Sequence, residues 1–308
     1  MYRRRILISL VVMLAGCSVL EPSSSTTATS TADIQAEEQS TIAASEETPI
    51  PESPCLAGDR PFARDGVISA FGGANGDATQ ISGIRWAAHQ DCERVVVDLL
   101  TADGAPAGAI DPVGVDYDAE LGIIRINLPE DVALSAIADS RFDGDLVNRV
   151  YVVATTGGGM AIDLHITPGA AIALRAFEAD SPSRIVIDVR SEEEATPAVG
   201  ATSTAQTVVL SPLPGPAATT ILVTGYARGT TDELTARIFS DPDRDLIAAQ
   251  EIALSGDASL WREFAARISG LPEQPLQLSV GFGSSEATQQ TTVNIDTTVS
   301  RVPDPPDV

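Results

Sequence analysis

The fold is decided by two short segments, Arg94-Val-Val-Val-Asp-Leu99 and Arg184-Ile-Val-Ile-Asp-Val189. In both, every second residue is aliphatic, and the positions between hold an arginine, a valine and an aspartate. A period of two is typical of a β-strand with one buried face, so we predict two strands here. If they pair antiparallel with Val96 opposite Val186, each arginine lies opposite the aspartate of the other strand. Two ion pairs would then fix the register; other structural roles and direct ligand contact are the alternatives.

The same patterning continues along the chain. Residues 260–268 fit both helical and strand spacing, and their neighbours favour a strand. We expect a short helix over 131–140, and we interpret the glycines at 157–159 as a hairpin turn because they lead into a strand and not into a helix. With aromatic residues at 4%, the cores must be aliphatic, and the chain is predicted to be all-β with two small β-sandwich domains. Further strands are predicted over 123–128, 147–154, 160–166, 221–227, 276–282 and 293–296.

Segments without periodicity divide the chain. Residues 17–54 and 191–206 are rich in Ser, Thr, Ala, Glu and Pro, and they hold too little apolar surface to form a core. The predicted order is a signal peptide over 1–16, a disordered stalk over 17–54, a first sandwich over 55–190, a linker over 191–206, a second sandwich over 207–299 and a disordered tail over 300–308.

The N-terminus has the pattern of a bacterial lipoprotein signal. Three arginines at positions 3–5 precede an apolar run over 6–14, which leads into Leu14-Ala15-Gly16-Cys17. The run is too short to span a bilayer permanently, and the small residues before the cysteine resemble a lipobox. The resemblance implies that Cys17 is acylated, for example with palmitate, and holds the protein on the extracytoplasmic face of a bacterial cell membrane. An ordinary secretory signal and an uncleaved anchor are the alternatives.

Two of the three cysteines remain once Cys17 is assigned to lipid. In an exported, oxidising setting we expect Cys55 and Cys92 to form a disulfide, which would stabilise the fold by about 3–4 kcal/mol through loop entropy. The alternative is a zinc site that uses His89 and Cys92. The chain has one further histidine, His165, far along the sequence, so we expect neither a metal nor another cofactor.

Acidic residues dominate the charge. The chain has 43 Asp and Glu against 19 basic residues, all of them arginine, and a net charge of -24. Such a field repels a phosphate backbone, so nucleic acid is not expected as a partner. The missing lysine fits the codon use of a GC-rich genome as well as a salty habitat.

Several motifs of the first predicted sandwich follow one another in a specific order. They are Phe62-Ala63-Arg64, the segment 92–99, Tyr151-Val152-Val153 with 160–164, and the closing segment 181–189. The region 55–190 thereby resembles the AMIN-like domain of exported bacterial lipoproteins. AMIN domains are β-sandwich modules that direct cell-wall amidases and secretion components to peptidoglycan, so the resemblance implies a role at the cell wall. It assigns no ligand contact to a particular residue.

The second predicted sandwich carries motifs of another family. They are Ser211-Pro-Leu-Pro-Gly-Pro216, Val223-Thr-Gly-Tyr-Ala227 and Trp261-Arg-Glu-Phe264. Through them the region 207–299 is similar to the immunoglobulin-like domain named for bacterial spore-germination proteins. Such domains also occur as appendages in organisms that form no spores, so the resemblance implies a binding or spacing module.

The polar residues form no recognisable catalytic motif. A zinc amidase needs several histidine and acidic ligands, and a serine hydrolase needs a Gly-x-Ser-x-Gly elbow. We interpret both histidines as strand residues on a polar face and expect no enzyme activity; a hydrolase with paired carboxylates is a third, less favoured hypothesis. The leading hypothesis is a non-catalytic envelope module that binds peptidoglycan or another wall glycan, and the alternative is one that binds envelope proteins and no glycan. The candidate ligand contacts are Arg94, Asp163, His165 and Arg184.

Overall fold

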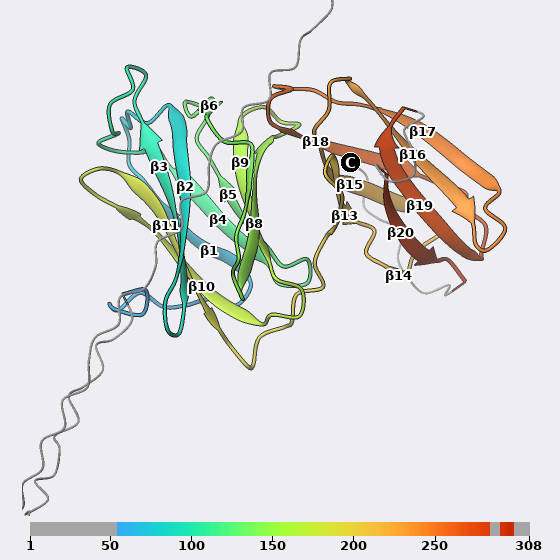
Figure 1. The fold of residues 1–308 in the computed structure, drawn as a ribbon, viewed down its shortest axis with the longest axis horizontal. Helices are drawn as coiled ribbons and strands as arrows, with labels where there is room; N and C mark the ends of the chain where they lie inside the picture. The colour runs from blue at the N-terminus through green and yellow to red at the C-terminus, as the bar shows by residue number, and fades with distance from the viewer. Residues whose placement is uncertain (1–53, 284–289, 299–308) are drawn as a thin grey trace, which may run out of the picture. The chain divides into compact units, whose positions relative to one another are not determined.

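The computed structural model describes residues 54–283 and 290–298. These residues form twenty strands and no helix (Figure 1), which confirms the predicted all-β class. The predicted signal peptide, the lipid attachment at Cys17, all but the last residue of the stalk, and the tail lie outside the described residues.

The strands form three sheets. The first runs in the order β10 (Ile172–Ala179), β11 (Arg184–Ser191), β3 (Glu93–Leu100), β2 (Gln80–Ala88), β6 (Leu134–Ser135). The second has ten strands in the order β1 (Gly66–Phe71), β4 (Val113–Asp118), β5 (Ile123–Asn127), β9 (Met160–Ile166), β8 (Val147–Ala154), β18 (Trp261–Ile268), β15 (Ile221–Ala227), β13 (Thr207–Ser211), β12 (Thr202–Ser203), with β7 (Asp139–Arg141) paired to β8. The third runs β14 (Gly215–Pro216), β20 (Thr291–Asp296), β19 (Pro275–Phe282), β16 (Glu233–Ser240), β17 (Leu246–Ala253).

Two large aliphatic cores hold the sheets together. In the first sandwich, Val97 and Ile187 of the five-stranded β10–β6 sheet share a core with Ile162 and Leu164 of β9. The second sandwich packs β13, β15 and β18 against the β14–β17 sheet, and its core contains side chains from both layers: Val223, Phe264, Leu278 and Val293. The sandwich packing agrees with the sequence patterns, while the domain boundaries given above stay predictions.

A third, smaller core joins the two sandwiches. Trp261 and Arg262 at the start of β18 pair in parallel with Val153 and Ala154 at the end of β8, so one sheet continues through both. Next to this pairing lies what we call the junction core, formed by Tyr151, Val153, Val208, Tyr226 and Trp261.

The junction core overturns one expectation about β9. The alternation over 160–166 predicts a half-buried strand with a polar face, yet all seven residues of β9 are buried. That prediction was wrong, because one face of β9 packs in the first core and the other lies under side chains of β5, β15 and β18. Asp163 and His165 are therefore 0% and 8% exposed, and His165 does not lie on a solvated polar face.

The predicted helix over 131–140 is also wrong. Leu134 and Ser135 form β6, which pairs in parallel with Gln80 and Ile81 of β2. The amide of Ala136 donates to the carbonyl of Ile81 at 2.9 Å. The open edge of β2 thus satisfies backbone groups that a helix would have satisfied internally.

The predicted linker packs against the first sandwich. Ala198 is 4% exposed, its amide donates to the carbonyl of Ala170 at 3.0 Å, and its carbonyl accepts from Gly169 at 2.9 Å. Gly122 has a positive φ of 68°, and a Cβ there would lie 2.4 Å from the Ala198 side chain, so this close approach requires glycine. The segment predicted as a linker is therefore ordered against the first sandwich at Ala198.

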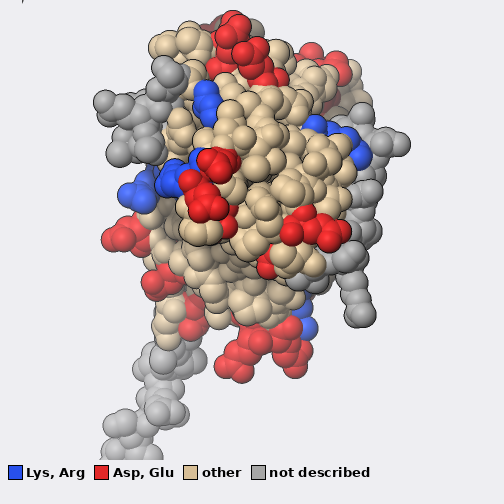
Figure 2. Space-filling model, turned by 90° about the vertical axis from the view of Figure 1, so that its right-hand side faces the viewer, with Lys and Arg blue, Asp and Glu red and all other residues tan. Residues whose placement is uncertain are grey.

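Other local predictions are confirmed. Residues 157–159 turn between the antiparallel strands β8 and β9, and the ambiguous segment 260–268 contains strand β18. The patterns missed β1, β2, β4, β10 and β13, and also the short strands β6, β7, β12 and β14. On the face shown in Figure 2, carboxylates form several separate groups and arginines are few, in line with the net charge.

Candidate functional site

The two segments that decide the fold pair as predicted. Strands β3 and β11 are antiparallel, with Val96 opposite Val186 and Arg94 opposite Asp188. The Arg94 guanidinium donates two hydrogen bonds to the Asp188 carboxylate, at 2.6 and 3.0 Å, and Asp188 is completely buried. One of the two expected ion pairs is therefore present.

The second expected ion pair is replaced by another. Arg184 lies opposite Asp98 in the register, but Asp98 accepts two hydrogen bonds from Arg85 on β2, at 2.6 and 2.8 Å. The Arg184 Nε instead donates to the carbonyl of Pro182 at 3.3 Å. The predicted Asp98–Arg184 pair was wrong, because β3 has β2 on its other side and Arg85 is the closer cation.

Asp188 has a second arginine partner that the sequence interpretation missed. Arg175 on β10 is 4% exposed, and its Nε donates to Asp188 at 3.1 Å. Its guanidinium lies 4.8 Å from the centre of the Phe62 ring. The signal in the sequence was one arginine inside the otherwise apolar run 172–177, which in a buried strand requires a carboxylate partner.

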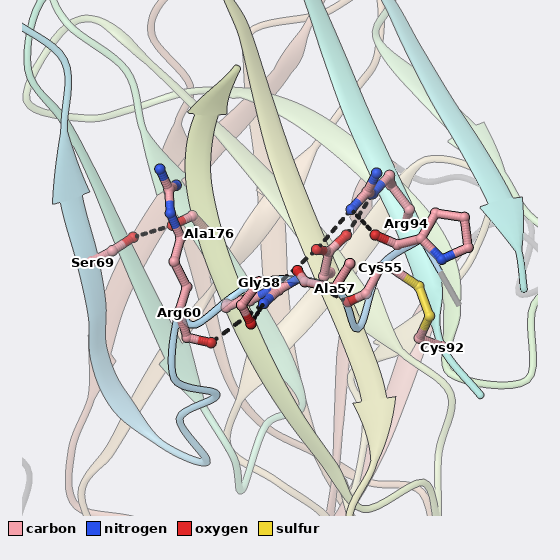
Figure 3. A network of polar contacts seen from close by, with 11 residues as sticks. Cys55, Ala57, Gly58, Arg60, Ser69, Cys92, Arg94 and Ala176 are labelled. Carbon is pink, nitrogen blue, oxygen red and sulfur yellow. Dashed lines mark hydrogen bonds and ion pairs between the residues drawn. A yellow bond between two sulfur atoms is a disulfide. The ribbon is translucent and has the colours of Figure 1, made fainter. Parts of the chain in front are cut away.

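The remaining donors of Arg175 hold the first described residues of the chain (Figure 3). Four backbone carbonyls accept from its Nη1 and Nη2, at 2.7–3.4 Å: those of Cys55, Ala57, Gly58 and Arg60. Arg94 adds a bond to the carbonyl of Pro54 at 3.1 Å. Two arginines thus replace the strand pairing that this irregular segment lacks.

The predicted disulfide completes the same cluster. Cys55 and Cys92 are bonded, with their Cα atoms 6.3 Å apart, and Cys92 immediately precedes β3. We call the group of Cys55, Cys92, Arg94, Arg175 and Asp188 the N-terminal clasp. Removal of either arginine would leave the buried carboxylate of Asp188 short of a partner, which typically costs about 3–5 kcal/mol, so the clasp depends on all of its charged members being present.

Asp163, the third candidate, lies in a different cluster. Arg125 on β5 donates to it twice, at 2.9 and 2.8 Å, and donates at 2.8 Å to Glu263 on β18. Burial raises the pKa of Asp163, against the effect of Arg125. Burial also acts to raise the pKa of Glu263. Hydrogen bonds from the Thr156 amide and from Arg125 outweigh this effect and keep the pKa of Glu263 below its ordinary value. The cluster links β5 and β9 to β18.

His165, the fourth candidate, lies in an aromatic environment. Its Nε2 shares a hydrogen bond with the hydroxyl of Tyr226, and its ring meets that of Tyr151 edge-on at 4.8 Å between centres. Burial, with Arg149 and Arg125 nearby, lowers the pKa of His165 to about 3. The imidazole is therefore neutral at ordinary pH.

The four candidates do not form one site. Arg94 and Arg184 come from the β10–β6 sheet, on the face away from the first core. Asp163 and His165 point away from the same core on the opposite layer. A single ligand-binding face made of all four is geometrically excluded. Arg94 and Asp163 are ion-paired within the protein and His165 is neutral, whereas Arg184 donates to the backbone carbonyl of Pro182.

A groove that the sequence did not indicate lies between the turn that joins β4 to β5 and the segment 210–222. It has a volume of about 570 Å³, within the range of ligand sites. Its lining combines apolar side chains from Leu121, Leu210 and Leu213 with the carboxylates of Asp118 and Glu120. Carboxylates accept hydrogen bonds from hydroxyl and amino groups, so the groove suits a ligand with such donors and an apolar face.

Comparison with models of known protein families found no match, and neither did a search of curated proteins. The family resemblances of the two sandwiches therefore stay predictions. In residues 54–283 and 290–298, no helix is long and apolar enough to cross a membrane. Over the same described part, no group of three or more His, Cys, Asp or Glu side chains is placed to hold a metal ion.

Proposed function

We propose that this protein is a non-catalytic lipoprotein that holds a wall-binding β-sandwich body at the outer face of a bacterial cell membrane. The observation that carries the proposal is the N-terminal clasp. A disulfide is typical of an exported protein, and this one lies where the predicted stalk meets the folded body. The AMIN-like motifs of the first sandwich point to peptidoglycan or another wall glycan as the ligand.

The clasp is suited to a tethered protein. Any tension on a lipid-anchored stalk would reach the body at Cys55, and the disulfide passes it to the start of β3. That strand is paired on both sides, by β2 and by β11, so the load is shared within the sheet and does not fall on an edge strand. Arg175 holds the adjoining backbone in four places, so the attachment does not depend on the covalent bond alone.

The groove lined by Leu121, Leu210 and Leu213 is the surface that we propose for wall binding. A volume of about 570 Å³ is large enough for a short sugar or peptide segment. Sugar rings present an apolar face and hydroxyl donors, and the groove offers leucine side chains and two carboxylates to match them.

The anchor is tested by replacing Cys17. In the native host, Cys17→Ala should release the protein from the membrane fraction or block its processing, whereas Ser18→Ala should fractionate as the wild type does. Intact-mass analysis of the mature protein gives the direct readout. An N-terminus other than acylated Cys17 would refute the anchor.

Wall binding is tested by a pull-down with purified insoluble peptidoglycan. Leu213→Glu places a charge in the groove and should reduce the fraction retained, whereas Leu246→Glu, on a side chain 57% exposed on β17, should not. Equal retention of both variants would remove the groove from the proposal. A wild-type protein that the wall fraction fails to retain would favour the alternative, a module that binds envelope proteins, which crosslinking in intact cells would then identify.

A further inference from the structure

A small polar pocket lies at the end of the first sandwich, between β7, β8, β9 and the segment that leads into β12. Its volume is about 120 Å³, the space of roughly four liquid waters. It shares no lining residue with the groove. The polar side chains among its lining residues are Arg141, Asn148, Arg149, Tyr151, His165 and Ser203.

Three basic side chains form one row across the strands of this pocket. Arg141 on β7 lies directly opposite Arg149 on β8, and Arg149 lies directly opposite His165 on β9. Like charges placed opposite one another on neighbouring strands repel and destabilise a sheet. A chain with a net charge of -24 and 19 arginines has many ways to avoid such a pair, so the pair calls for an explanation.

The nearby carboxylate does not balance these charges. Asp139 accepts from Arg149 at 3.1 Å, but it also accepts from Arg228 at 3.3 Å and from the indole of Trp261 at 3.0 Å. The Asp139 carboxylate thus accepts hydrogen bonds from three side chains, two of them arginines, and its single negative charge cannot balance both. Within the described residues, the Nε of Arg149 is buried and has no hydrogen-bond partner.

The remaining walls of the pocket are polar and well held. Tyr151 and Ser203 contribute two hydroxyl groups to the lining. Gly200 has a positive φ of 84°, and a Cβ there would lie 2.9 Å from the ring of Pro168, so the backbone closes this side tightly. Such a pocket offers hydrogen-bond donors in fixed positions and little apolar surface.

We infer that this pocket binds one oxyanion, a carboxylate or a phosphate group, between Arg141 and Arg149. An oxyanion there would relieve the repulsion between the two guanidiniums. Guanidinium groups bind both anion classes through paired N–H donors. The inference goes beyond the proposed function and does not depend on it, because it concerns a separate pocket.

The test uses sodium phosphate and sodium acetate as probes, with sodium chloride holding the ionic strength constant. Binding is followed in ¹H–¹⁵N spectra of the arginine Nε–H groups, and thermal unfolding is recorded alongside. The Arg149 signal should shift saturably with at least one probe, and that probe should raise the melting temperature. Arg149→Gln and Arg141→Gln should each weaken binding at least tenfold, whereas Arg244→Gln, on an exposed turn, should bind as the wild type does.

The same variants separate an anion site from a structural one. Without added anion, Arg141→Gln should be at least as stable as the wild type, because it removes a repulsion. Arg149→Lys keeps the charge and the fold and should retain weaker binding. A response to acetate alone would identify the ligand class as a carboxylate, and a response to phosphate alone would identify it as a phosphate group. In the second case, vesicles that contain phosphatidylglycerol test whether the phosphate belongs to a lipid.

Two results would overturn the inference. One is a wild-type protein in which neither probe shifts the Arg149 signal saturably. The other is a folded Arg149→Gln variant that binds with wild-type affinity. Failure of wall binding in the peptidoglycan pull-down would leave this inference untouched, so the two proposals can fail separately.

Discussion

Acidification from pH 7 to pH 4 should destabilise the protein by about 3 kcal/mol through His165 alone. The pKa of this imidazole is about 3 in the folded protein and about 6.5 in an unfolded chain. Below pH 6.5 the unfolded state therefore binds a proton that the folded state does not bind. The stability that depends on neutral His165 is fully present above pH 6.5 and is lost progressively as the pH falls toward 3.

The surroundings of His165 explain the direction of this effect. The side chain is 8% exposed and packs against Tyr151 and Tyr226. A proton on the ring would place a third positive charge near Arg149 and Arg125, and a side chain that is 8% exposed has little contact with water to solvate that charge. Each pKa unit corresponds to about 1.4 kcal/mol, which gives the figure of about 3 kcal/mol over the interval from 6.5 to 4.

The assay compares wild type with His165→Gln by urea unfolding at several pH values. Glutamine has no titration in this range and can still bond to the Tyr226 hydroxyl, so the variant should lose less stability than the wild type between pH 7 and pH 4, by about 3 kcal/mol. A Trp86→Phe background leaves Trp261, a member of the junction core, as the one tryptophan reporter. The control is His89→Gln, which removes the other imidazole and should keep the wild-type pH dependence. Parallel pH profiles for wild type and His165→Gln would refute the reasoning.

Three further changes test the clasp, the second sandwich and the contact between the sandwiches. Replacing Cys55 and Cys92 together by serine should lower the stability of the first sandwich by about 4 kcal/mol, measured by urea unfolding without reductant. Two free thiols titrated in the exported wild type would contradict the disulfide on which this prediction rests. Gly225→Ala should destabilise the second sandwich by about 1–3 kcal/mol, because the new methyl would lie 2.0 Å from a backbone oxygen; an unchanged melting temperature would show that β15 can move. Glu263→Gln should cost about 1 kcal/mol, since its ion pair with Arg125 is partly exposed. Because the fold keeps the pKa of Glu263 below its ordinary value, the loss should shrink as the pH falls through that lowered pKa, and a loss that stays constant down to the lowest pH at which the protein is folded would contradict an electrostatic cause.

The sequence could predict the pairing of β3 and β11 because the information is local. Two segments with the same charge spacing and the same aliphatic period have one antiparallel register that pairs opposite charges, and that register is present. Partners beyond the pair could not be predicted in this way. Asp98 binds Arg85 and not Arg184, and Asp188 binds Arg175 as well as Arg94, because each strand has a second neighbour whose identity depends on the whole sheet order.

The burial of β9 was missed for a related reason. Alternation separates the two faces of a strand, but it does not say what covers each face. A polar residue on the second face can be solvated or it can be buried with a partner, and the partners here come from far along the chain: Arg125 for Asp163, and Tyr226 for His165. A usable signal was present in the adjacent strand, where the run 150–154 is apolar at every position, as in strands that are covered on both faces. Since neighbouring strands in a sheet share their covering layers, a continuous apolar run beside an alternating one indicates that the polar residues of the alternating strand are buried and paired.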